Sequence, residues 1–145
     1  MPLDALFIHE LTHIVMYELI QPGKGGDGGV PRWIQEGIAT HMVRVWPDED
    51  ERLMRELVAA GTIPALSQLT GSGGFVNERV NYAVGHAAFD YIESRWGPTS
   101  IRRFLGALII PRKDRTYDAV FELTPTEFDE AFRQYAKRRF TPVVR

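Results

Sequence analysis

Residues 3–20, LDALFIHELTHIVMYELI, constrain the fold more than any other part of the chain. Apolar residues occur at every angle around a helix built from this segment, and Pro22 and Gly23 would end such a helix. A helix that is apolar on all sides is usually buried. We therefore predict a buried helix that runs from about Asp4, its N-terminal cap, to Gln21.

Three ionisable side chains lie in the middle of this apolar segment: His9, Glu10 and His13. Buried polar groups need a hydrogen-bonding partner or a metal ion. His9 and His13 are four residues apart, so both imidazoles can reach one ion at about 2.0–2.1 Å. Glu10 lies about 100° further round the helix, beside the histidine face. This HExxH spacing predicts a Zn²⁺ site with Glu10 as general base; the alternative is two core histidines and a glutamate that bond to nearby backbone.

A catalytic zinc site needs a third protein ligand and an open fourth position. The metzincin pattern, HExxHxxGxxH, is excluded because Met16 and Leu19 occupy its glycine and third histidine positions. A glutamate on a second helix is the other common solution. Glu36 lies in a predicted helix over residues 32–46, and the glycine-rich loop before it is long enough to return this helix beside the first. Gly37 then allows the two backbones to approach closely.

Two other residues compete with Glu36 for the third position. His41 is five residues after Glu36 and points away from it on a helix. Asp27 lies in the glycine-rich loop, where no packing fixes it. We rank both below Glu36, for which the alternative is a surface glutamate of an amphipathic helix.

HELTH followed by PRWIQEGIAT resembles the paired motifs of gluzincin metallopeptidases, in particular the peptidase MA-like families. In those families a Trp-x-x-Glu-Gly-x-Ala stretch supplies the glutamate ligand, and Trp33, Gly37 and Ala39 match its other positions. The resemblance implies that His9, His13 and Glu36 bind Zn²⁺ and that the glutamate of HELTH is catalytic. The spacing between the motifs is a few residues longer than in the related zinc aminopeptidases.

The segment NYAVGHAAFDYIESRWG also resembles these families, which carry a helix of this kind against the active site. Tyr82, His86 and Phe89 share one face of the helix. Tyr82 or His86 can donate a hydrogen bond to the oxyanion formed during peptide hydrolysis. The alternative is equally open: Tyr82 as a core aromatic residue and His86 as a hydrogen-bonded core residue.

The remaining pattern is helical, so we predict an all-α fold over residues 1–145. Further helices are expected over residues 48–61, 78–96, 99–110, 114–121 and 125–140, and no segment shows the alternation of a strand. The resemblance implies a single gluzincin-like helical catalytic domain. The β-sheet that usually precedes the HExxH helix in such peptidases is expected to be missing from this chain, which is then a fragment of a longer protein, relies on a partner domain for that wall, or has lost it.

Composition excludes several classes of function. There are no cysteines, so disulfides and thiolate ligands are ruled out, and the formal net charge of −2 gives no footprint for nucleic acid. We predict neither a signal peptide nor a transmembrane segment. Location is left open; the resemblance favours a bacterial extracytoplasmic protein.

We therefore expect a zinc-dependent metallopeptidase that acts on a peptide or protein substrate. The main alternative, prompted by the missing sheet, is a non-catalytic zinc-binding or interaction module derived from a peptidase. A third and weaker hypothesis is a helical bundle that binds no metal.

Overall fold

The computed structural model describes residues 1–21, 23, 29–69, 77–108 and 116–143. No strand occurs among these residues, so the predicted all-α fold is confirmed. The described elements are the α-helices α1 (Leu3–Ile20), α2 (Arg32–Val43), α3 (Asp48–Ala60), α4 (Glu78–Trp96), α5 (Thr99–Ala107), α6 (Thr116–Phe121) and α7 (Pro125–Phe140), and the 3-10 helix η1 (Leu66–Gln68).

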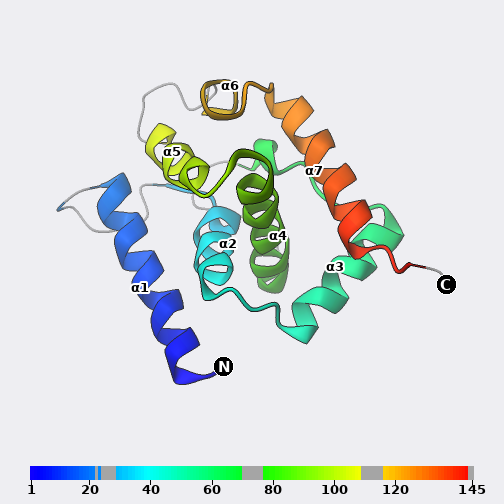
Figure 1. Cartoon of the computed structure of the whole chain (residues 1–145), viewed down its shortest axis with the longest axis horizontal. Helices are drawn as coiled ribbons and strands as arrows, with labels where there is room; N and C mark the ends of the chain where they lie inside the picture. Colours follow the sequence, from blue (N-terminus) through cyan, green and yellow to red (C-terminus); the bar gives the residue numbers. More distant parts are fainter. Residues whose placement is uncertain (22, 24–28, 70–76, 109–115, 144–145) are drawn as a thin grey trace.

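Helix α2 lies at the centre of the fold, with α1 along one side and α4 along the other (Figure 1). Every residue from 33 to 41 is buried. Four of these buried side chains are polar, and each has a partner inside the fold. Gln35 donates to the carbonyl of Val30, Thr40 donates to that of Glu36, and His41 and Glu36 contact ionisable side chains of other helices. These contacts offset the free-energy cost of burying four polar side chains.

The backbones of α2 and α4 touch at a pair of glycines. A Cβ atom built on Gly37 would lie 2.5 Å from the Cα of Gly85, and one built on Gly85 would meet the carbonyl oxygen of Trp33. Any larger residue would force the helices apart. The sequence suggested that Gly37 serves the contact between the first two helices; the glycine-to-glycine contact is instead with α4.

Helix α1 is not buried on all sides, so that prediction is wrong. His9, Met16 and Ile20 are its only buried residues. Its outward apolar side chains are exposed, among them Phe7 at 66% and Ile14 at 60%. The exposure results from tertiary packing. Among the described elements, α1 packs mainly on α2 and more lightly on α5, along one side only.

Two predicted helix ends differ from the structure. Helix α1 begins at Leu3 after Pro2, and Asp4 lies inside its first turn, so Asp4 is not the cap. Helix α2 ends at Val43, because Arg44 adopts a left-handed conformation with φ of 65°. Trp46 therefore leaves the helix direction and stacks on a side chain of α4.

Other predicted boundaries agree with the structure to within a few residues. Helix α7 begins with the predicted capping box, in which Thr124 accepts from the Glu127 amide and Glu127 accepts from that of Thr124. Residues 109–110 and 114–115, at the predicted ends of two other helices, lie outside the described residues.

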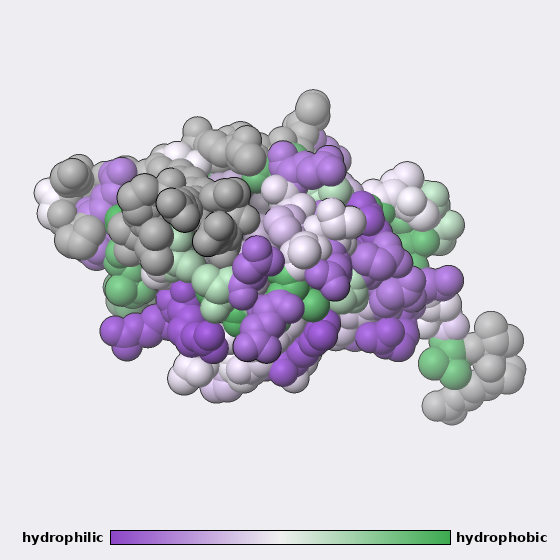
Figure 2. Space-filling model, turned by 90° about the horizontal axis from the view of Figure 1, so that it is seen from above, coloured by the Kyte–Doolittle hydropathy of each residue, from purple (hydrophilic) through white to green (hydrophobic). Residues whose placement is uncertain are grey.

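One continuous apolar core takes side chains from every described α-helix, including Met16 and Ile20 of α1 and Met54 of α3. The described surface seen from above is mostly polar, and its apolar residues form small patches (Figure 2). Within the described ranges, no helix combines the length and the apolar character that crossing a membrane requires.

Candidate metal centre

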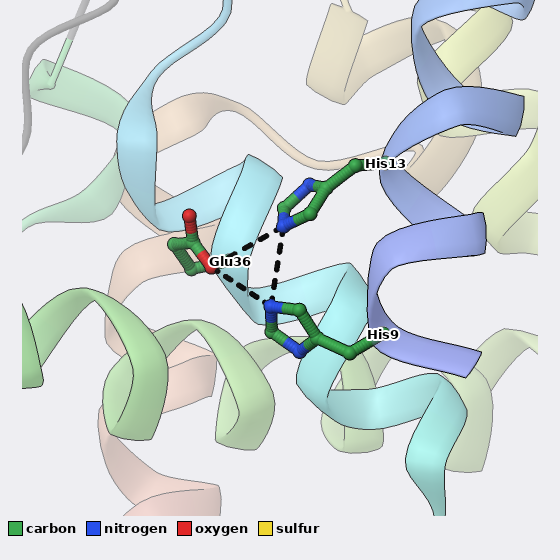
Figure 3. Close-up of side chains that lie close together, drawn as sticks. All are labelled: His9, His13 and Glu36. Atoms are coloured by element: carbon green, nitrogen blue, oxygen red, sulfur yellow. Dashed lines mark hydrogen bonds and ion pairs between the residues drawn. The ribbon is translucent and has the colours of Figure 1, made fainter. Parts of the chain in front are cut away.

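Three predicted ligand residues meet where α1 crosses α2. His9 and His13 project from one face of α1, and Glu36 points toward them from the middle of α2 (Figure 3). His9 is 5% exposed and Glu36 only 2%, while His13 is partly buried. The alternative hypothesis, that Glu36 is a surface glutamate, is therefore wrong.

The three ligand atoms form a nearly equilateral triangle. Nε2 of His9 lies 3.2 Å from Oε2 of Glu36 and 3.2 Å from Nε2 of His13, and the third side, between His13 and Glu36, is 3.4 Å. The edge of a tetrahedron is about 1.6 times its bond length, so Zn²⁺ at about 2.0–2.1 Å from each ligand requires edges of about 3.3–3.4 Å. The spacing of the donor atoms fits zinc.

The chemistry of these donors also fits a cation. Each imidazole Nε2 carries at most one proton, so protons alone cannot make all three contacts favourable at once. Burial of Glu36 opposes its ionisation, but hydrogen bonds from His13 and His9 and the charge of Arg32 hold the pKa of this carboxyl far below its usual range. Two imidazoles and an ionised carboxylate are the ligands of a catalytic zinc site of the His₂Glu type.

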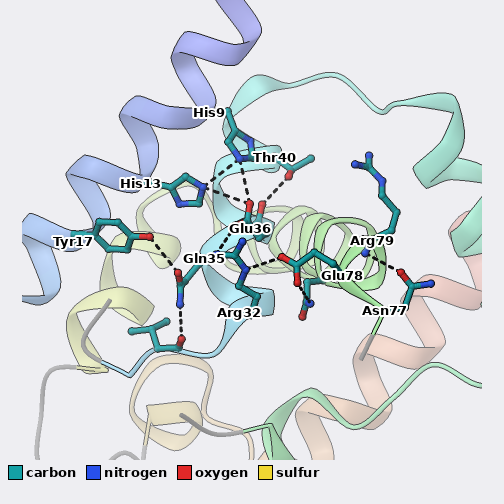
Figure 4. A network of polar contacts seen from close by, with 12 residues as sticks. His9, His13, Tyr17, Arg32, Gln35, Glu36, Thr40, Asn77, Glu78 and Arg79 are labelled. Atoms are coloured by element: carbon teal, nitrogen blue, oxygen red, sulfur yellow. Dashed lines mark hydrogen bonds and ion pairs between the residues drawn. The ribbon is translucent and has the colours of Figure 1, made fainter. Parts of the chain in front are cut away.

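Arg32 contacts the other oxygen of the carboxylate. Its Nη1 lies 2.9 Å from Oε1 of Glu36, and its Nε donates to Oε1 of Glu78 at 2.7 Å (Figure 4). Neither Arg32 nor Glu78 was predicted to belong to the site. A signal for the first contact was present, because an arginine four residues before a glutamate on a helix forms such pairs. No local sequence pattern predicts the contact between Arg32 and Glu78.

Tyr82 of α4 lies beside these residues. Its ring stacks on His9 with centroids 5.9 Å apart, and the Arg79 guanidinium lies 5.1 Å from the ring centroid. Burial, together with the charge of Glu36 and a hydrogen bond to it, raises the pKa of Tyr82 to about 12. The phenol therefore stays protonated at neutral pH and remains a hydrogen-bond donor.

Glu10 and a cavity flank the histidines. Glu10 follows His9 on α1 and its side chain is exposed. A largely apolar cavity of about 380 Å³ opens beside His9, between Ala5 of α1, Val43 of α2 and Arg79 of α4. Of the three candidate ligands, only His9 lines this cavity, which can hold part of a ligand.

His86 does not join this group. It is 1% exposed, its ring is covered by Trp46 at a centroid distance of 3.9 Å, and its Nε2 lies 3.5 Å from Asp90. Such a covered ring cannot reach a substrate, so we withdraw His86 as an oxyanion donor.

His41, which competed with Glu36 as the third ligand, forms a second group of side chains together with His86 and Asp90. Its Nδ1 forms a hydrogen bond with Asp90 at 2.6 Å, and its Nε2 forms one with Glu93 at 2.5 Å. These are hydrogen-bond lengths, shorter than the edges of a zinc tetrahedron, and they occupy both nitrogens. Although His41, His86 and Asp90 also bring possible ligand atoms within 4.8 Å of one another, their arrangement fits hydrogen bonding better than metal binding. Asp27, the other rival, lies outside the described residues.

Comparison with known proteins adds no family: no family model, no curated protein and no solved structure matches this chain.

Proposed function

We propose that this protein is a zinc-dependent peptidase of the gluzincin type. The observation that carries the proposal is the triangle of His9, His13 and Glu36, whose edges of 3.2–3.4 Å suit one tetrahedral Zn²⁺. The resemblance of HELTH and RWIQEGIA to the gluzincin motifs supports the same ligand set. When bound, zinc supplies a water of lowered pKa and polarises the scissile carbonyl.

Glu10 is the general base in this proposal. Its carboxylate is exposed and adjacent in sequence to a ligand, so it can approach a water at the site while it does not bind the ion itself. Glu10 takes the proton from the attacking water and passes it to the leaving amine.

Tyr82 stabilises the negative charge that develops on the scissile carbonyl oxygen. Its phenol is protonated, close to the ligands and held by contacts with His9 and Arg79. A fixed donor of this kind acts mainly in the transition state, where the oxygen is most negative. The apolar cavity beside His9 is suited to an apolar side chain of the peptide substrate.

The test separates metal binding from catalysis. We expect Glu10→Gln to keep one zinc per chain but to abolish hydrolysis of a fluorogenic peptide library, whereas His9→Ala loses the zinc. Glu18→Gln, an exposed glutamate of the same helix, is the matched control and should leave both unchanged. Full activity of Glu10→Gln, or activity that resists a chelator, would falsify the proposed mechanism.

One observation favours the non-catalytic alternative, a zinc-binding interaction module. The outward face of α1 exposes Leu6, Phe7, Leu11, Ile14 and Val15, a surface that suits contact with another protein surface. Stoichiometric zinc with no chelator-sensitive hydrolysis of any library peptide would favour this alternative over the peptidase.

A further inference from the structure

The two oxygens of the Glu36 carboxylate have different partners. Oε2 faces the imidazoles of His9 and His13, and Oε1 contacts Nη1 of Arg32 at 2.9 Å. A carboxylate can bind a metal through one oxygen or through both. Arg32 occupies the oxygen that would otherwise be free to turn toward the ion, and it leaves one oxygen for the ligand triangle.

A second contact holds the guanidinium of Arg32 in place. Its Nε donates to Oε1 of Glu78 at 2.7 Å, so one guanidinium bridges two carboxylates on different helices (Figure 4). Glu78 is the first residue of α4, and Tyr82 lies one turn later on that helix. The bridge therefore links the ligand helix α2 to the start of the helix that carries Tyr82.

Contacts that orient the two histidines from outside the ligand set are scarce. Metal-bound histidines usually donate their second ring nitrogen to an acceptor, which fixes the ring. Here the Nδ1 atoms of His9 and His13 are buried and have no hydrogen-bond partner within the described part of the chain. Orientation of the ligand set therefore depends on contacts with Glu36, which Arg32 meets at Oε1 and to which Tyr82 forms a hydrogen bond.

We propose that Arg32 is a positioning residue, which Glu78 holds in place and which keeps Glu36 as a single-oxygen ligand so that the fourth position of the metal stays open. This inference rests on the zinc site of the proposed function but not on peptide hydrolysis.

Two effects of Arg32 on metal affinity have opposite signs, which makes the inference testable. As a positive charge close to the site, Arg32 repels a cation, so its removal alone would tighten zinc binding. As the residue that orients Glu36, it favours binding, and loss of such an orienting partner typically weakens metal affinity by about 10–100-fold. The positioning role predicts weaker binding in Arg32→Gln.

The first measurement is zinc affinity, by competition with a chromophoric chelator. We expect Arg32→Gln to bind zinc about 10–100-fold more weakly than the wild type. Arg32→Lys keeps the charge but cannot bridge both carboxylates in the same way, so it should also bind zinc more weakly than the wild type. The matched control is Arg55→Gln, which removes an exposed arginine from a similar pair with Glu51 on α3 and should have no effect.

A second measurement reports the coordination of the ion. With Co²⁺ in place of Zn²⁺, the visible absorption bands weaken as the number of ligand atoms rises above four. We expect weaker bands in Arg32→Gln, because the released Oε1 of Glu36 becomes an additional ligand, and unchanged bands in the Arg55 control.

A third variant shows whether Glu78 acts through Arg32. Glu78 is 54% exposed at its side chain, so Glu78→Gln should fold normally and weaken zinc binding several-fold. The same substitution should have no further effect in the Arg32→Gln background, because the two residues act as one unit.

Zinc affinity in Arg32→Gln equal to or above that of the wild type, with unchanged Co²⁺ bands, would overturn the inference, and so would full additivity of the two substitutions. A wild-type chain that binds no zinc overturns both this inference and the proposed function. Stoichiometric zinc without hydrolysis overturns only the proposed peptidase activity. The role of Arg32 is then decided by the zinc affinities of its variants.

Discussion

Glu36 and His41 lie on one buried helix but serve different groups of side chains. Five residues separate them, which turns the second side chain about 140° from the first on an α-helix. Glu36 consequently faces α1 and its histidines, whereas His41 faces Asp90 and Glu93 of α4. Helix geometry thus separates the candidate metal ligands from the hydrogen-bonded group.

Tyr82 provides a prediction at the level of a single atom. Tyr82→Phe removes the phenol oxygen and keeps the ring that stacks on His9. We expect kcat for peptide hydrolysis by the zinc-loaded protein to fall by about 10²–10³-fold, because one transition-state donor is lost. Steady-state kinetics and zinc titration of the same preparation check this; an unchanged kcat would rule out Tyr82 as the oxyanion donor.

His86 provides a prediction about pH. Burial, only partly offset by the charge of Asp90, lowers the pKa of His86 to about 4. An unfolded histidine has a pKa of about 6.5, so between these values the unfolded chain binds a proton that the folded chain does not. The free energy of unfolding should therefore fall, by up to about 3 kcal/mol, as pH decreases from about 6.5 to about 4.

Urea denaturation at several pH values, with chelator present so that no metal contributes, measures this dependence. His86→Gln should have a flatter profile over the same window, whatever its stability at neutral pH. If the variant and the wild type lose stability in parallel between these pH values, His86 is not the group responsible.

At the scale of elements, the crossing of α2 and α4 depends on Gly37 and Gly85. Their backbones are so close that an added methyl group would overlap main-chain atoms rather than a movable side chain. Because α2 also carries Glu36, this contact sets the distance between the ligand helix and the helix of Tyr82.

We expect Gly37→Ala to lower the free energy of unfolding by about 1–3 kcal/mol or more, as overpacking of a tight interface does. The matched control is Gly106→Ala on α5, where an added Cβ meets nothing within 4 Å. The control should be neutral or stabilising by about 0.5–1 kcal/mol, because alanine restricts the unfolded chain. Chemical denaturation of the three proteins decides; equal stability of all three would show that the two helices can separate freely.

At the scale of the whole molecule, α1 leaves most of its apolar side chains exposed and meets the rest of the fold through Met16, Ile20 and the candidate ligands. An ion held by His9 and His13 on α1 and by Glu36 on α2 would fasten this helix to the rest of the fold. Metal binding and the stability of the fold are therefore linked.

We expect free Zn²⁺ at about 100 times its Kd to stabilise the protein by about 2.7 kcal/mol, which raises Tm by about 5–10 °C. His9→Ala should abolish the shift, and Mg²⁺ should not reproduce it because Mg²⁺ prefers oxygen ligands. Thermal unfolding with each ion measures the effect. A wild-type Tm that is indifferent to Zn²⁺ would contradict a metal site at this crossing.

Much of the architecture could be predicted from local signals. Proline and glycine ended most helices near the predicted residues, the Thr124 capping box fixed the start of α7, and the four-residue spacing placed His9 and His13 on one face. Signals of this kind act within one turn of a helix, so they require no knowledge of neighbouring elements. The candidate Glu36 was reached by resemblance and by elimination of alternatives.

Local sequence alone therefore determined the all-helical fold and the two histidines on one face of α1. Only the tertiary structure decided that α2, the less apolar of the two helices, is buried while the apolar α1 is exposed, and that Gly37 meets Gly85. It also decided that Arg32 bridges Glu36 and Glu78 and that Trp46 covers His86. These outcomes depend on contacts between residues far apart in the chain, and neither residue of such a pair carries a local signal of the other.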